Sequence, residues 1–82
     1  MILMSMVKIE KNLAIELAET NLALINNDID EILHRWNQNS AEKFIEDTRA
    51  GLIPEAELDA IAMTNLIDKR DQLERLLYRL GE

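Results

Sequence analysis

Apolar side chains recur at alternating steps of four and three residues between positions 18 and 36. The series is Ala18, Leu22, Ile25, Ile29, Ile32 and Trp36, and Ile15 adds one step before it. Such spacing places a single apolar line along one helix face, which must pack against another helix. Because no Gly or Pro occurs between residues 8 and 37, the pattern predicts one long helix over residues 5–36, with Ser5 as its N-cap.

A second apolar stripe lies about a third of a turn away on the N-terminal half of the same helix. It comprises Met6, Leu13, Leu17 and Leu24, and charged side chains at Asp28 and Arg35 end it. A helix that is apolar on two sides usually packs against more than one neighbour. This half of the helix is therefore expected to need a second partner.

A polar break at residues 37–40 separates the long helix from a short one. The break contains two Asn, a residue type that tolerates the backbone conformation found at helix ends. Ser40 is a favourable N-cap for a helix over residues 41–49. This helix can bury Phe44 and is stopped by Gly51.

A third helix is predicted over residues 54–80, because Pro54 suits its first position and Gly81 its end. Its main apolar line consists of Leu58, Ala62, Leu66, Leu73, Leu76 and Leu80, with Ile61 and Leu77 alongside. A thinner second stripe consists of Ala60, Met63, Ile67 and Tyr78. This helix, too, is expected to carry more apolar surface than one neighbour covers.

Together these elements predict an all-α fold that forms a single helical domain over residues 1–82. Two long helices of closely matched length, joined through the short helix, form an antiparallel hairpin. Pairing two hairpins as a homodimer would cover the second stripes and give a four-helix bundle. The expected dimer interface consists of Met6, Leu13, Leu17, Leu24, Met63 and Ile67. The pattern leaves open whether the assembly is a dimer or a tetramer, and whether residues 41–49 pack on their own hairpin or on the other copy.

Size and charge narrow the possible functions. A chain of 82 residues buries a modest core, and without Cys it has neither disulfides nor thiolate metal sites, so association is the remaining way to gain core. A net charge of −7 without a basic stripe argues against nucleic-acid binding. Acidic amphipathic helices likewise argue against binding to an anionic membrane. Residues 1–7 are too short to span a membrane and lack the features of a signal peptide, so a cytoplasmic location is expected.

Three residues are candidates for chemistry. Lys69 lies on the apolar line of the third helix. It could pack its aliphatic stem on apolar side chains while its ammonium stays in water, or it could fix the register between the packed helices. The third alternative is a buried functional lysine. Glu31 and His34 have the Glu-x-x-His spacing of di-metal sites in helical bundles, and a dimer would supply two copies. The plainer interpretation is a solvated pair, because the chain has one His and it lies opposite the apolar line.

Trp36 ends the apolar line and is expected either to anchor the hairpin or to serve a partner as a hot spot. Lys69 is the other candidate for contact with a partner. The acidic runs over residues 27–31 and 55–59 are expected to be solvated or to meet a basic partner. No nucleophile–base pair, Gly-rich phosphate loop or dinucleotide fingerprint occurs, so neither a catalytic residue nor a cofactor is predicted.

The sequence thus predicts a homodimeric, non-enzymatic protein-interaction module. One alternative is a regulator that docks on a basic partner, as an antitoxin, an anti-activator or a modulator of a signalling protein would. Another is a dimeric di-metal bundle that uses Glu31 and His34.

Overall fold

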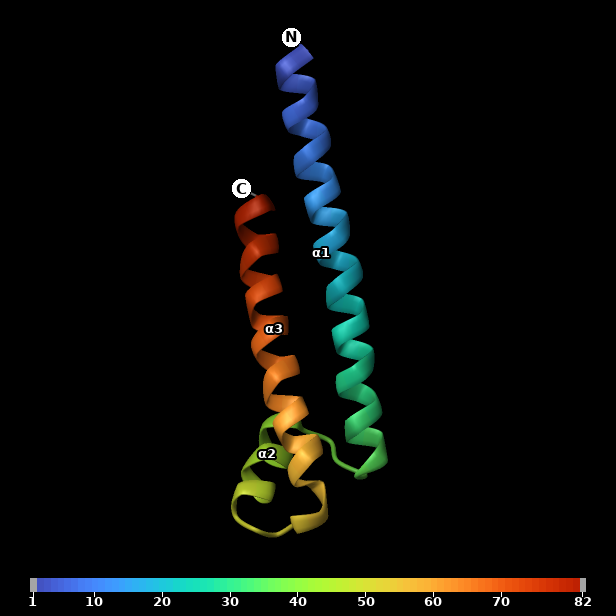
Figure 1. The fold of residues 1–82 in the computed structure, drawn as a ribbon, viewed down its shortest axis with the longest axis vertical. Helices are drawn as coiled ribbons and strands as arrows, with labels where there is room; N and C mark the ends of the chain where they lie inside the picture. Colours follow the sequence, from blue (N-terminus) through green and yellow to red (C-terminus); the bar gives the residue numbers. More distant parts are fainter. Residues whose placement is uncertain (1, 82) are drawn as a thin grey trace.

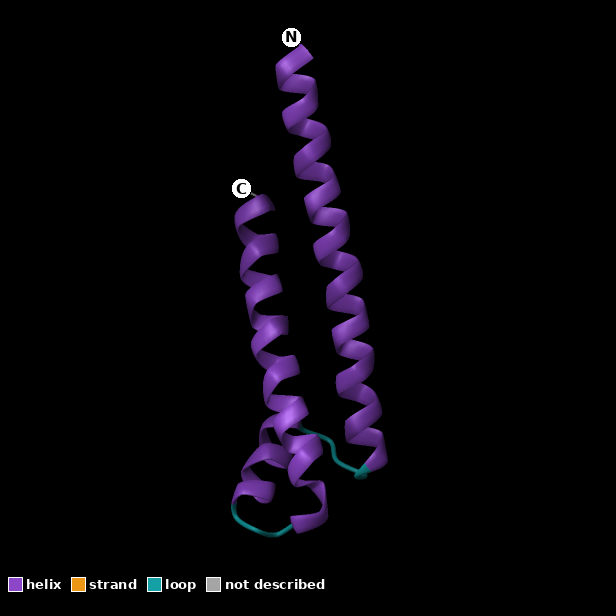
Figure 2. Ribbon diagram, viewed as in Figure 1, coloured by secondary structure: helices purple, strands orange, loops and turns teal. Residues whose placement is uncertain are grey.

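The computed structural model describes the backbone of residues 2–81 and the side chains of residues 10–81. Its elements in chain order are α1 (Ile2–Arg35), α2 (Ala41–Arg49), the 3-10 turn η1 (Pro54–Ala56) and α3 (Glu57–Gly81). No strand occurs within residues 2–81, so the predicted all-α class is confirmed (Figure 2). In that same stretch, none of the helices combines the length and the apolar character needed to cross a membrane.

The two long helices lie side by side and antiparallel, with α2 and η1 at the closed end of the hairpin (Figure 1). The molecule measures 60 × 18 × 18 Å, and its radius of gyration is 17.0 Å, against about 12 Å for a compact domain of this length. The expectation of matched helix lengths is wrong, because α1 has 34 residues and α3 has 25. The N-terminal end of α1 extends beyond the C-terminal end of α3 (Figure 1). Ser5 lies inside α1 rather than capping it, because the helix begins at Ile2.

The core is located where all three helices meet. Ile29 and Ile32 of α1, Phe44 of α2, and Ala60 and Met63 of α3 pack into one buried cluster, in which Phe44 and Met63 are 0% exposed. The predicted apolar line of α1 is confirmed, because its members are buried or half-buried: Ala18, Leu22, Ile25, Ile29, Ile32 and Trp36. Residues from all three helices therefore stabilise the closed end together.

Local signals explain why α2 folds back on its own chain. Ser40 is extended (φ −137°, ψ 127°), and its hydroxyl Oγ accepts a hydrogen bond from the Lys43 backbone N–H at 3.2 Å. Asn37 has a φ of 54° after α1, and Gly51 has a φ of 80° after α2, both in the left-handed region that commonly ends helices. Between these breaks α2 contacts both α3 and α1. Residues 41–49 thus pack on their own hairpin.

The position of α2 corrects the predicted faces of α3. Ala60 and Met63, assigned from the sequence to a second and uncovered stripe, are buried in the cluster that contains Phe44. Leu58, assigned to the line facing α1, is 81% exposed, and Ile61 is also exposed. The physical reason is that α2 packs on the adjacent side of α3, so the buried face at this end is rotated by about a third of a turn. Met63 is therefore not available to a second copy, contrary to its predicted place in the dimer interface.

Candidate functional site

A row of uncovered leucines runs along α1. Leu13, Leu17 and Leu24 are 51–57% exposed, and their spacing places them on one side of the helix, about a third of a turn from the line that faces α3. We call these three residues the leucine face. Met6, predicted to belong to the same stripe, lies outside the described side chains. Ile67, also predicted for the interface, is half-buried against the core cluster.

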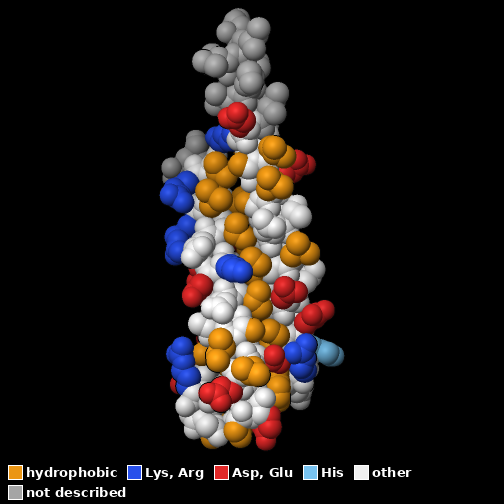
Figure 3. Space-filling view, in the orientation of Figure 1, with side chains coloured by type: hydrophobic (Ala, Val, Ile, Leu, Met, Phe, Trp, Pro, Cys, Tyr) orange, Lys and Arg blue, Asp and Glu red, His pale blue; other side chains and the backbone are white. Residues whose placement is uncertain are grey.

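A groove of about 740 Å³ adjoins the leucine face, between α1 and α3. Leu24 and Ile25 of α1 and Leu66, Leu73 and Leu76 of α3 give it apolar walls, and the remaining lining residues are polar or charged: Asn21, Asp28, Lys69, Gln72, Arg75 and Arg79. Figure 3 shows hydrophobic side chains along the seam between the two helices on this side of the molecule. A continuous surface of mixed apolar and charged character therefore extends from the leucine face across to α3.

Lys69 lies in the middle of this groove. Its side chain is exposed, although its neighbours in the lining include Leu66, Leu73 and Leu76. This environment suits a lysine that packs its stem on apolar surface and keeps its ammonium in water. It does not suit a buried functional lysine.

Trp36 is held at the closed end by two contacts. Its indole Nε1 donates a hydrogen bond of 2.7 Å to Asp59 Oδ2, and its ring stacks on Phe44 with the ring centroids 6.4 Å apart. Arg35 Nη1 donates to the same Asp59 oxygen, also at 2.7 Å. These contacts fit the prediction that Trp36 anchors the hairpin. Sequence reasoning missed Asp59, because it belongs to an acidic run that was interpreted as solvated, and the only signal was its place one turn into the third helix.

The pKa of the Asp59 carboxyl is lowered, first by the hydrogen bond from the Trp36 indole and then by that from Arg35. A carboxylate whose pKa is lower in the folded than in the unfolded state adds stability above its unfolded pKa, near 4, and this stability is lost as the pH falls through the folded pKa. The hairpin should therefore lose stability below about pH 4, and Asp59→Asn should reduce that loss.

Urea unfolding at pH 7 and pH 3 tests this expectation, with the fluorescence of Trp36, the single Trp of the chain, as the signal. Asp30→Asn is the matched control, because Asp30 is exposed on α1. If both variants lose the same stability between the two pH values, the Asp59 carboxylate does not have this role.

Glu31 and His34 are both exposed on α1, in an open hollow that Asn27, Asp30 and Arg35 also line. Within the described part of the chain, no three or more His, Cys, Asp or Glu side chains are grouped so that they could hold a metal ion. The structure thus places Glu31 and His34 in one hollow, but within residues 10–81 they belong to no cluster that could hold a metal ion.

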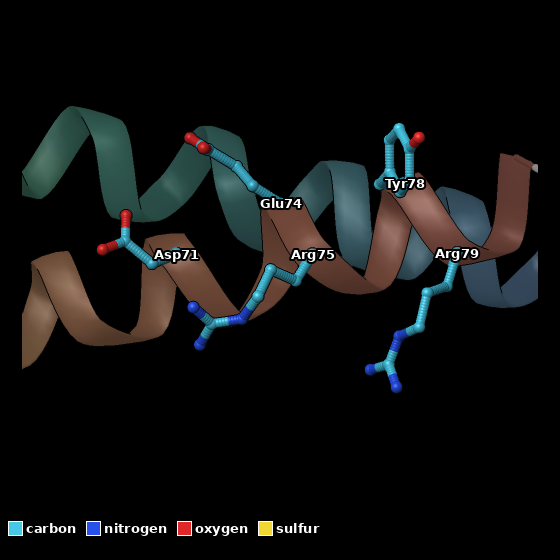
Figure 4. A pocket seen from close by; sticks show the side chains of 5 residues that line it. All are labelled: Asp71, Glu74, Arg75, Tyr78 and Arg79. Atoms are coloured by element: carbon cyan, nitrogen blue, oxygen red, sulfur yellow. The ribbon is translucent and has the colours of Figure 1, made fainter.

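A shallow hollow also runs along the outer side of α3, where all five lining residues belong to the same helix (Figure 4). Arg75 and Arg79 extend from one side of α3, and Glu74 and Tyr78 from the other (Figure 4). Among the described side chains, only those of α3 line this hollow, so it does not enclose a small molecule. Arg75 and Arg79 also line the groove between α1 and α3.

The chain matches no protein-family model, and neither a curated protein nor a solved structure is significantly similar to it. The candidate site therefore rests on the leucine face and the adjoining groove alone.

Proposed function

We propose that this chain acts through protein association rather than catalysis, and that its first partner is a second copy of itself. The observation that carries the proposal is the leucine face, since Leu13, Leu17 and Leu24 are more than half exposed. The total surface supports the same conclusion. It amounts to 6393 Å², against about 5,000 Å² for a compact monomer of 9.5 kDa. The excess exceeds the roughly 800 Å² that each partner buries in a standard interface.

The three leucines alone give little free energy to spare for association. Fully burying one leucine is worth about 1.5–3 kcal/mol, so covering the exposed half of three leucines contributes about 3 kcal/mol per copy. Two copies together gain about 6 kcal/mol, while association costs roughly 4–15 kcal/mol in lost freedom of motion. The apolar walls of the groove beside Leu24 would add to this gain, and this supports including the groove in the proposed interface.

Thermal unfolding at several protein concentrations tests the proposal. If association stabilises the folded chain, the melting temperature rises with concentration, because the dimer is favoured by mass action. We expect a rise of several degrees between about 1 and 100 μM, measured by circular dichroism at the helix signal. A melting temperature that stays constant over this range would argue for a self-sufficient monomer.

A further inference from the structure

We propose that the second copy packs its leucine face onto the α3 side of the groove, with both α2 segments at the same end of the resulting four-helix bundle. In this arrangement α1 of each copy lies against α3 of the other. The proposal deepens the association argued above and rests on it. It adds the orientation of the two hairpins and the residues that determine it.

The groove is basic on its α3 side. Lys69, Arg75 and Arg79 are the charged lining residues on that side, and Asp28 is the charged residue that α1 contributes. Asp68 does not line the groove, but it is exposed and lies within about 20° of Arg75 and Arg79 on the circumference of α3, so these three bases and one acid leave a net positive charge on that side. Among the side chains of residues 10–81, the ion pairs include none of these three bases. In a chain of net charge −7, this surface therefore attracts acidic groups.

The leucine face is flanked by acids. Counting about 100° per residue, four acidic residues fall within about 60° of Leu13 on the helix circumference, and all are exposed: Glu10, Glu16, Asp28 and Glu31. Arg35 lies on the same side but already pairs with Asp59. Figure 3 shows several basic side chains on the α3 side of the seam and several acidic ones on the α1 side, with further acidic side chains on the α3 side and at the closed end. The leucine face is thus the acidic, apolar counterpart of the basic, apolar groove.

Two-fold symmetry allows two face-to-face arrangements of the hairpins. If their closed ends point in opposite directions, α1 lies on α1 and α3 on α3, so acidic surface meets acidic surface and basic meets basic. If their closed ends point the same way, α1 lies on α3 in both halves of the interface, and opposite charges meet. Since like charges across an interface are costly, the charge pattern favours the second arrangement.

The alignment of α1 and α3 within one hairpin is consistent with closed ends that point the same way. Arg35 and Asp59 pair across the hairpin, so they lie at the same height along it and serve as the reference for other residues. Because both helices rise about 1.5 Å per residue in opposite directions, Lys69 lies level with Ile25, and Arg79 lies level with Ile15.

Rotation about a two-fold axis parallel to the bundle does not change the height of a residue along that axis. The second copy's Asp28 therefore lies within about 5 Å of Lys69 in height, and its Glu16 within about 2 Å of Arg79. Leu17 and the second copy's Leu76 likewise lie at nearly the same height along the axis.

A distance between the two closed ends tests the orientation. Glu55 is exposed in η1, and the chain has no Cys, so Glu55→Cys carries a single nitroxide label far from the groove. In the proposed arrangement the two labels lie about 20–30 Å apart, two to three helix diameters. With the closed ends opposed they lie about 40–50 Å apart, because each label is about 20 Å from the level of Lys69.

Pulsed electron–electron double resonance measures this distance, and light scattering on the same sample gives the molecular mass in solution. Together the two measurements distinguish three outcomes. A dimeric mass with the short distance supports the proposal. A dimeric mass with the long distance overturns the orientation and leaves the association intact. A monomeric mass without a dipolar distance overturns both, and the groove would then be free for a different acidic helix.

A charge exchange provides a second test. Glu16→Lys and Arg79→Glu should each weaken association about tenfold, since each acts at two symmetric places, and the double variant should restore most of the loss. Asp30→Lys is the control, because Asp30 is exposed but lies on another side of α1. Equal weakening by the control and the two single variants, or no recovery in the double variant, would contradict the pairing.

Discussion

Phe44→Ala is expected to lower the free energy of unfolding by about 3–5 kcal/mol. Phe44 is 0% exposed and packs in the cluster that joins α1, α2 and α3, where it also stacks on Trp36. Truncation leaves a cavity that neighbouring side chains fill only partly. A small domain has a total stability of only about 5–15 kcal/mol, and an 82-residue chain lies near the low end, so this variant should be largely unfolded near 37 °C.

Urea unfolding followed by far-ultraviolet circular dichroism measures this loss. Tyr78→Ala is the matched control, since it removes an aromatic ring that is exposed on α3. Surface changes of this kind usually stay within about 0.5 kcal/mol. Similar losses in the two variants would show that the cluster around Phe44 is not the main source of stability.

Leu17→Glu is expected to weaken self-association by at least about a hundredfold. The side chain lies in the middle of the leucine face, and burying a carboxylate there costs more than the attraction of the second copy's Arg75 and Arg79 returns, because the desolvation penalty of a buried charge can exceed its Coulombic gain. Glu16 next to it adds like-charge repulsion on the same surface. The hairpin itself should stay folded, because Leu17 is more than half exposed in a single copy.

Leu52→Glu is the matched control for that experiment. It makes the same substitution at another exposed leucine, in the loop between α2 and η1. Size-exclusion chromatography with light scattering compares the two variants, and circular dichroism verifies that each keeps its helices. If both variants associate like the parent chain, or if both lose association equally, the leucine face is not the interface.

The parts of the fold that depend on local patterns could be predicted from the sequence. The four–three spacing from Ala18 to Trp36 identified the side of α1 that packs on its neighbours. Ser40 predicted the start of α2, because an N-cap acts through a hydrogen bond three residues away. These signals lie within a few residues of the feature they determine.

The parts that depend on the direction of α2 could not be predicted. Nothing in the sequence near Leu58 indicates that α2 covers Met63 instead, since that depends on the path of the chain through Asn37 and Gly51. Asp59 could not be separated from its acidic neighbours, because its hydrogen bonds come from residues 23 and 24 positions away. The leucine face was recognised because an apolar stripe repeats along a helix whether or not it is covered.

Sedimentation equilibrium of the unmodified chain shows directly whether two copies associate. Over concentrations from about 1 to 100 μM, we expect a mass that approaches twice the 9.5 kDa of a single chain. The same measurement on Leu17→Glu should give a single-chain mass over most of that range. A mass of 9.5 kDa for the unmodified chain at every concentration would show that Leu13, Leu17 and Leu24 remain in water, and the account of this protein as a self-associating hairpin would be wrong.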